Sequence, residues 1–121
     1  MDRIVIAPSN PIVSIGPLLA LPRLRAAVAR RRDDVVAVSP IVAGAALKGP
    51  ADRLMRELGH EPSVVGVARL YREVAGTLVV DEADAGLARA VDAEGIRCVV
   101  APTVMHDVPA AAALAATVLT C

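Results

Sequence analysis

The chain has 121 residues, of which 55% are hydrophobic, and its thirteen basic and thirteen acidic residues give a formal net charge of zero. This length fits one domain, the hydrophobic fraction excludes intrinsic disorder, and the charge balance provides no overall positive field for nucleic acid or an anionic membrane. Two cysteines, Cys98 and Cys121, are too few for a disulfide scaffold, so we expect a cytoplasmic protein.

Short β-branched segments alternate with helical patterns along the whole chain. Strands are predicted at 3–7, 35–38, 77–80 and 97–101. Helices are predicted through the spacing of Leu18, Leu21, Leu24 and Val28, and at about 50–58, 63–72, 83–93 and 108–119. This alternation predicts a single α/β domain over 1–121, with a mainly parallel sheet and helices on both faces, as in half of a Rossmann-like fold.

Ligands of such sheets bind where loops leave the carboxyl ends of the strands. In this chain those loops cover 8–16, 39–50, 81–83 and 102–107. They contain most of the unusual small, polar and proline residues, so the functional residues are expected there.

The first of these loops reads APSNPIVSIGP and combines Ser9, Asn10 and Pro11 with Ser14, which can cap the following helix. A strand, a small polar loop and a helix N-terminus together form an anion site, because unpaired N–H groups point outward. The alternative is ordinary turn and capping chemistry, since such loops are common, and the loop pattern by itself favours this alternative.

The second loop reads SPIVAGAALKGPADRLM and contains the only lysine of the chain, Lys48, next to Gly49. A glycine-rich loop with a lysine that enters a helix suits phosphate binding. The Walker A spacing is absent. A solvated lysine on a surface loop explains the pattern equally well.

Carboxylates cluster after the third predicted strand, at Asp81, Glu82 and Asp84. Asp81 can cap a helix, and carboxylates also suit Mg²⁺. Capping is favoured because it explains the cluster without a metal. A zinc site is not predicted, because His60 and His106 have no partner at ligand spacing.

The arginine run at 30–32 ends a predicted helix, where positive charge is favourable, and acidic residues follow it directly. We therefore interpret this run as a solvated helix terminus and not as a nucleic-acid patch.

Several motifs occur together in a fixed order. The chain carries IAPSNPIVSIGPLLALP, then VSPIVAGAALKGPADRLMRELG, then SVVGVARLY, and later LVVDEADAG and APTVMHDV. In order and spacing, over nearly all 121 residues, these motifs resemble the carboxyl-terminal part of the 2-phospho-L-lactate transferase family (CofD/FbiA). The combination of PSNP-x-x-SI with KGPAD is the most specific element.

The resemblance implies a transferase of deazaflavin coenzyme biosynthesis. Such an enzyme moves a phospholactyl or phosphoenolpyruvyl group from a guanosine-diphosphate-activated donor to the ribityl hydroxyl of a 7,8-didemethyl-8-hydroxy-5-deazariboflavin, and GMP leaves. The resemblance also implies Mg²⁺ and a dimer, and it identifies no catalytic residue in this chain. The substrate- or nucleotide-binding residues that it implies are Ser9, Asn10, Pro11, Ser14, Lys48, Gly49, Thr103 and Met105.

Members of this family are more than twice as long, and their amino-terminal half opens with a glycine-rich strand and loop followed by acidic residues. This chain has no G-G-x-G-G run. We therefore expect the main metal ligands to lie outside it, the fragment alone to be inactive, and a second copy or another chain to complete it. The alternative is a nucleotide-binding regulatory module of the related gluconeogenesis-factor-like branch, and a third interpretation is an inert half-domain.

Overall fold

The computed structural model describes residues 3–8, 11, 15–46, 51–104 and 107–120. Its central sheet has four parallel strands in the order β1-β2-β5-β6. These strands are β1 (Ile4–Ile6), β2 (Val35–Val38), β5 (Thr77–Val80) and β6 (Arg97–Val100). All four predicted strands are therefore confirmed, within a residue at their ends.

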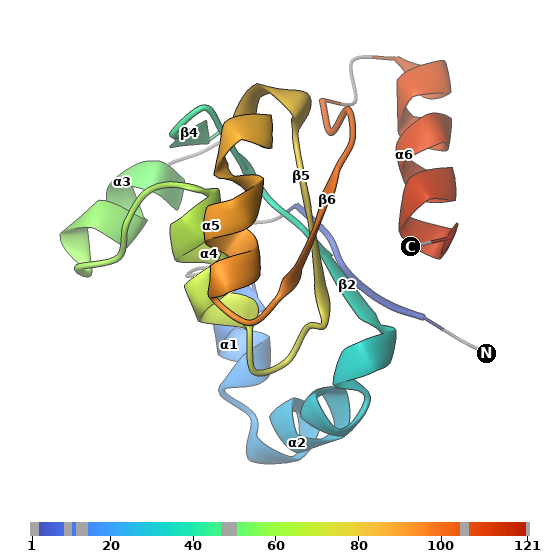
Figure 1. The fold of residues 1–121 in the computed structure, drawn as a ribbon. Coiled ribbons are helices and arrows are strands. Elements are labelled where there is room, and N and C mark those ends of the chain that lie inside the picture. The colour runs from blue at the N-terminus through green and yellow to red at the C-terminus, as the bar shows by residue number, and fades with distance from the viewer. Residues whose placement is uncertain (1–2, 9–10, 12–14, 47–50, 105–106, 121) are drawn as a thin grey trace.

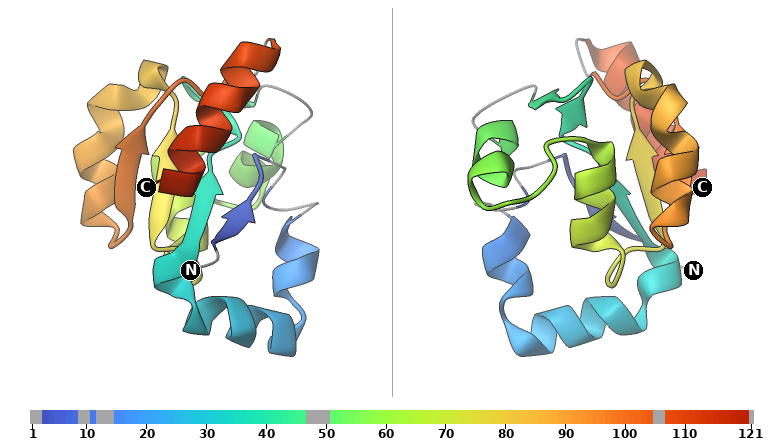
Figure 2. Two further views of the ribbon diagram at one scale, coloured as in Figure 1. Left: turned by 90° about the vertical axis from the view of Figure 1, so that its right-hand side faces the viewer. Right: turned by 60° about the vertical axis from the view of Figure 1, so that its left-hand side comes forward.

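Helices cover both faces of the sheet, which gives a three-layer α/β fold (Figures 1 and 2). Each strand pairs with the next strand of the sheet along the chain, so right-handed crossovers place the intervening helices on one face. These helices are α1 (Gly16–Leu19), α2 (Pro22–Arg30), α3 (Ala51–Glu57), α4 (Val64–Tyr71) and α5 (Ala88–Ala93). The last helix, α6 (Val108–Thr120), lies on the opposite face (Figure 1). Within the described residues, no helix is long and apolar enough to cross a bilayer.

Successive side chains along each strand point to opposite faces of the sheet, so the core is divided into two parts. Val35, Ala37, Leu78 and Val80 face α3, α4 and α5, and they belong to the larger cluster of buried residues. Their neighbours Val36, Val38 and Val79 face the other way and pack with Leu114 and Val118 of α6. The second face thus has a much smaller core, because one described helix covers it.

The single helix that we predicted through Leu18 and Val28 is wrong, because the structure divides it into α1 and α2. The break falls at Leu21, whose ψ of 114° is extended. Leu21 precedes Pro22, and the proline ring disfavours the helical conformation in the residue before it.

The loop predicted at 39–50 contains a short antiparallel hairpin, which the sequence analysis missed. Its strands are β3 (Ile41–Val42) and β4 (Ala45–Ala46). Ala43 and Gly44 between them both have positive φ, 52° and 82°, as a tight two-residue hairpin turn requires.

The arginine run that we interpreted as a solvated terminus includes a structural side chain. Arg32 lies in the 3₁₀ turn η2 (Arg32–Asp34), and its guanidinium donates to the carbonyl oxygens of Arg72 at 2.6 Å and Gly95 at 2.5 Å. These carbonyls lie just beyond α4 and α5, where backbone acceptors lack helical partners. Arg32 therefore links the segment before β2 to the segments that precede β5 and β6.

Tyr71, the only aromatic residue, is 2% exposed, and its hydroxyl has no hydrogen-bond partner among the described residues. Burial raises the pKa of this hydroxyl above its ordinary value. We expect Tyr71→Phe to raise the free energy of unfolding by about 1 kcal/mol, because it removes an unsatisfied buried polar atom and keeps the ring. Urea denaturation measures the change, and a loss of stability would show that the hydroxyl has a partner.

Candidate functional site

Polar residues follow the carboxyl ends of three neighbouring strands. Ser39 follows β2, Asp81 follows β5, and Thr103 comes shortly after β6. Ser39 and Thr103 are 1% and 2% exposed, so this edge has polar groups held inside the fold. The carboxyl edge of such a sheet is where α/β proteins bind their ligands.

Asp81 organises this edge through three hydrogen bonds. Its carboxylate accepts from the backbone N–H of Ala83 at 3.0 Å, which confirms the predicted cap at the start of the 3₁₀ helix η3 (Glu82–Leu87). It also accepts from the backbone N–H of Thr103 at 2.8 Å and from the Thr103 hydroxyl at 3.1 Å. Partial burial opposes ionisation, but these donors outweigh it and hold the pKa of Asp81 below its ordinary value.

Asp84 has a different role, which the sequence analysis missed. Its side chain is buried, and its Oδ2 accepts the backbone N–H of Ala43 at 3.0 Å. This bond ties η3 to the hairpin turn between β3 and β4. No local pattern indicated it, because the two residues are 41 positions apart.

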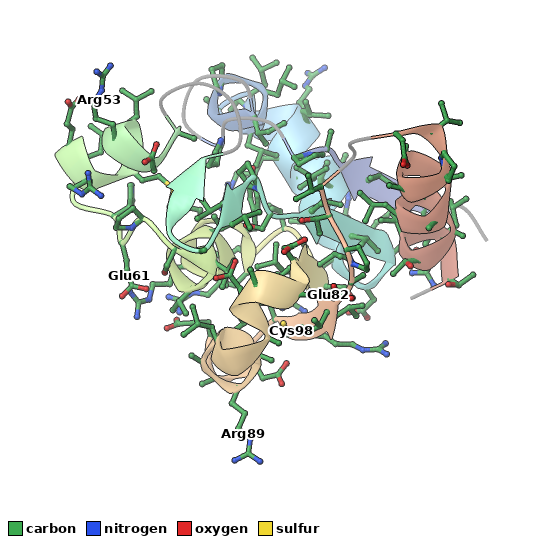
Figure 3. The ribbon with its side chains drawn as sticks, turned by 90° about the horizontal axis from the view of Figure 1, so that it is seen from above. Arg53, Glu61, Glu82, Arg89 and Cys98 are labelled. Atoms are coloured by element: carbon green, nitrogen blue, oxygen red, sulfur yellow. The ribbon has the colours of Figure 1, made fainter. Side chains whose placement is uncertain are left out.

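Two of the three carboxylates after β5, those of Asp81 and Asp84, are therefore engaged in structural hydrogen bonds. Figure 3 views this edge from above, with Glu82 near the centre and Arg53 of α3 and Arg89 of α5 pointing outward at the periphery. Among the described residues, no group of three or more His, Cys, Asp or Glu side chains could hold a metal ion. The described part of the chain thus does not fit a complete Mg²⁺ site.

Two of the predicted binding residues, Pro11 and Thr103, lie in the described part of the chain. Thr103 lies at the carboxyl edge, fixed by Asp81 as above. Pro11 is buried after β1, and its carbonyl oxygen lies 2.9 Å from where a Cβ on Gly16 would be, so this close approach requires glycine. The other predicted binding residues lie outside the described residues, namely Ser9, Asn10, Ser14, Lys48, Gly49 and Met105.

A cavity of about 320 Å³ lies beside Pro11, between α1 and α4. Leu19, Leu70 and Tyr71 give it a mostly apolar lining. Arg25 at its wall is paired with Glu73 at 2.6 Å, so its charge is already partnered. This lining offers less for an anionic ligand than the polar carboxyl edge does.

Cys98 on β6 is half-buried, and desolvation, followed by the nearby Asp92 carboxylate, raises the pKa of its thiol to about 11. A thiol that remains protonated at neutral pH is a poor nucleophile. Cys98 therefore acts as a packing residue against the larger cluster of buried residues.

The fold and its polar carboxyl edge define a Rossmann-like α/β domain whose ligand loops follow the strands. A family model described as "2-phospho-L-lactate transferase CofD" matches residues 1–119, and the chain belongs to this family.

Named relatives agree with this membership. The chain is 46% identical over 117 residues to the phosphoenolpyruvate transferase of Streptomyces griseus, which covers 94% of the chain and 36% of the relative. It is 43% identical over 104 residues to the 2-phospho-L-lactate transferase of Methanosarcina acetivorans, and this match covers 86% of the chain and 33% of the relative. For the 2-phospho-L-lactate transferase of Methanocaldococcus jannaschii the identity is 40% over 93 residues, covering 77% and 29%. The chain thus spans about a third of the length of the curated relatives that it matches.

Proposed function

We propose that this chain is part of a transferase that moves a phospholactyl or phosphoenolpyruvyl group from a guanosine-diphosphate-activated donor to the ribityl hydroxyl of a deazaflavin precursor. The observation that carries the proposal is the family match over residues 1–119. Relatives named phosphoenolpyruvate transferase and relatives named 2-phospho-L-lactate transferase both lie at 40–46% identity. The proposal therefore includes both a phosphoenolpyruvyl and a phospholactyl donor. The proposed reaction releases GMP, belongs to deazaflavin coenzyme biosynthesis, and takes place in the cytoplasm.

In this proposal the loop after β1 binds the diphosphate or the substrate. Its residues are Ser9, Asn10, Pro11 and Ser14, and their small polar groups and backbone N–H groups suit phosphate oxygens. Lys48 and Gly49 serve the same diphosphate from the second loop, because a lysine on a flexible stem provides a compact positive charge.

Thr103 and Met105 belong to the third proposed binding segment. The Thr103 hydroxyl and N–H both donate to Asp81, so these two groups are engaged within the protein. We propose that this contact sets the path of the loop and that Met105 lines the substrate. Thr103 is then a positioning residue.

Mg²⁺ is the proposed cofactor, because phosphoryl transfer needs charge neutralisation on the transferred group. Because the resemblance places the family's acidic metal-binding residues in the amino-terminal half, we place the main ligands in a part of the enzyme outside this chain. Catalysis therefore requires that part, and the chain alone is proposed to be inactive. We propose that another chain or a second copy completes it.

Nucleotide selectivity tests the proposal directly. We expect calorimetric titration in the presence of Mg²⁺ to show that the chain binds GDP in preference to ADP and UDP, because the donor carries a guanosine diphosphate. Preference for UDP would instead support a regulatory module of the gluconeogenesis-factor-like branch. Binding of none of the three would contradict the assignment of the diphosphate to these loops.

Lys48→Met should weaken GDP binding about tenfold at low salt, because a charge-assisted contact to phosphate is lost. The difference should shrink as salt screens the interaction. Arg53→Met is a matched control, since Arg53 is an exposed cation on the helix that follows the same loop, with its side chain 68% exposed. Unchanged GDP affinity of Lys48→Met at low salt would remove Lys48 from the site.

A further inference from the structure

The hairpin after β2 has a turn conformation that its sequence does not favour. Ala43 has a φ of 52° and Gly44 has a φ of 82°, so both turn residues lie in the left-handed region. Glycine adopts this conformation without steric cost, but alanine does not, because its Cβ approaches a backbone carbonyl oxygen. Such strain persists only where the surrounding structure imposes it, and it is concentrated at functional sites.

The hairpin is held at its tip and at its base by hydrogen bonds. At the tip, the carboxylate of Asp84, which is 5% exposed, accepts the backbone N–H of Ala43 at 3.0 Å. At the base, the hydroxyl of Ser39 accepts the backbone N–H of Ile41 at 3.1 Å and donates to its carbonyl oxygen at 3.2 Å. Ser39 and Ile41 are both buried, so the base is fixed inside the fold. Asp84 is the contact that reaches the strained residue from another loop.

The 3₁₀ helix η3 lies between two loops that we propose as binding segments. Strand β5 lies between β2 and β6 in the sheet, so η3 emerges between the loops that follow these two strands. Asp81 at its start accepts from Thr103 after β6, and Asp84 accepts from Ala43 after β2. Figure 1 shows β4 of the hairpin at the same end of the sheet as the carboxyl end of β5. The two loops are therefore held by carboxylates that are three positions apart in the chain.

We propose that Asp84 is a positioning residue for nucleotide binding, because it holds the Ala43–Gly44 turn and so orients the second proposed binding loop. The hairpin belongs to that loop, which carries Lys48 in its sequence. Asp84 acts through the backbone N–H of Ala43 and does not contact the ligand. This inference rests on the proposed function, since it concerns how GDP is held.

Calorimetric titration of the chain with GDP in the presence of Mg²⁺ tests the proposal. Asp84→Ala should weaken GDP binding about tenfold, because the turn loses its tether. Asp84→Asn should stay within about threefold of the wild type, because the amide oxygen can accept the same N–H. Asp92→Ala is the matched control, since Asp92 also accepts one backbone N–H, that of Cys98 at 2.9 Å, but at the outer edge of β6. Its GDP affinity should equal that of the wild type.

A second substitution in the turn separates positioning from direct contact. Adding Ala43→Gly to Asp84→Ala should restore GDP affinity to within about threefold of the wild type, because glycine adopts the turn conformation without the tether. Backbone amides of β3 and β4 should exchange hydrogen faster in Asp84→Ala without nucleotide, and Ala43→Gly should reverse this change.

Gly44→Ala disturbs the same turn while Asp84 is intact. The nearest atom to a Cβ added at Gly44 is the carbonyl oxygen of Pro62, 3.8 Å away, so the strain comes from the positive φ and not from crowding. This variant should also weaken GDP binding. It replaces Asp84→Ala if circular dichroism shows that Asp84→Ala does not fold.

Three results would overturn the inference and leave the proposed function intact. The first is GDP binding by the wild type with unchanged affinity in Asp84→Ala. The second is equal weakening by Asp84→Asn and Asp84→Ala, because the charge would then be required and not the hydrogen bond. The third is failure of Ala43→Gly to restore binding. Absence of GDP binding by the wild type would instead contradict the proposed function, and unchanged hydrogen exchange in Asp84→Ala would then still show that Asp84 does not hold the turn.

Discussion

Asp81→Ala should lower the free energy of unfolding by about 2–4 kcal/mol, since it removes a helix cap and two further hydrogen bonds to a buried threonine. The cap serves Ala83, and the other two bonds hold the N–H and hydroxyl of Thr103. Urea denaturation measures the loss. Asp92→Ala is the control, because Asp92 accepts one backbone N–H at the exposed β6 edge, and it should cost less than about 1 kcal/mol.

The contribution of Asp81 should also depend on pH. Its pKa is lowered in the fold from the ordinary value of 3.8, so its contribution is fully present above the pKa of the unfolded chain. That contribution is lost as the pH falls through the lower pKa of the folded state. The stability difference between the wild type and Asp81→Ala should therefore shrink below about pH 4. A difference that stays constant down to pH 2 would show that the charge of Asp81 contributes nothing.

Gly66→Ala should have the largest effect on stability, with a loss of about 3 kcal/mol or more. A Cβ at this position would overlap the carbonyl oxygen of Glu61 and lie 3.1 Å from Cε of Met55. Relief requires a movement of the backbone at the start of α4, where Ser63 caps the helix by accepting the Gly66 N–H at 3.3 Å.

Thermal melting followed by circular dichroism measures this loss. Gly86→Ala is the control, because no atom lies within 4 Å of a Cβ built at Gly86 and its φ is ordinary. This control should melt within a few degrees of the wild type. A melting temperature of Gly66→Ala equally close to the wild type would show that the start of α4 can move without cost.

The strands could be predicted from the sequence because each is a short β-branched segment bounded by turn or helix signals. Val35–Val38 and Thr77–Val80 agree with the prediction at both ends. Ser63 and Gly59 likewise mark the start of α4 and the turn after α3, where Gly59 has a φ of 81°. These features depend on neighbours in the sequence, so local patterns are sufficient to find them.

The elements that prediction missed depend on contacts between distant residues. The β3–β4 hairpin is two residues long on each side, and Asp84 holds its turn from another loop. Half of the helix predicted at 83–93 is a 3₁₀ helix, Glu82–Leu87, stabilised at its start by Asp81. Arg32 was interpreted from its neighbours in the run, although its partners are 40 and 63 residues away.

The location of the candidate site could be predicted from the sequence, but its internal contacts could not. The loops were expected at the carboxyl edge, and the structure places Asp81 and Thr103 there. The link between these two residues could not be predicted, because it depends on β5 and β6 being neighbours in the sheet. The roles of Asn10 and Lys48 stay predictions, since both residues lie outside the described part of the chain.

The order of the strands has a consequence for how the chain folds. Each strand of the central sheet pairs with the strand of that sheet that comes next along the chain, so β2 can form on β1, β5 on β2, and β6 on β5. No later segment has to be inserted between two strands that are already paired. Each pairing nevertheless closes a long crossover, as between Val36 and Thr77, and this loop-closure cost makes parallel sheets slow to form. The domain can still assemble one βα unit at a time, in the direction in which the ribosome releases it.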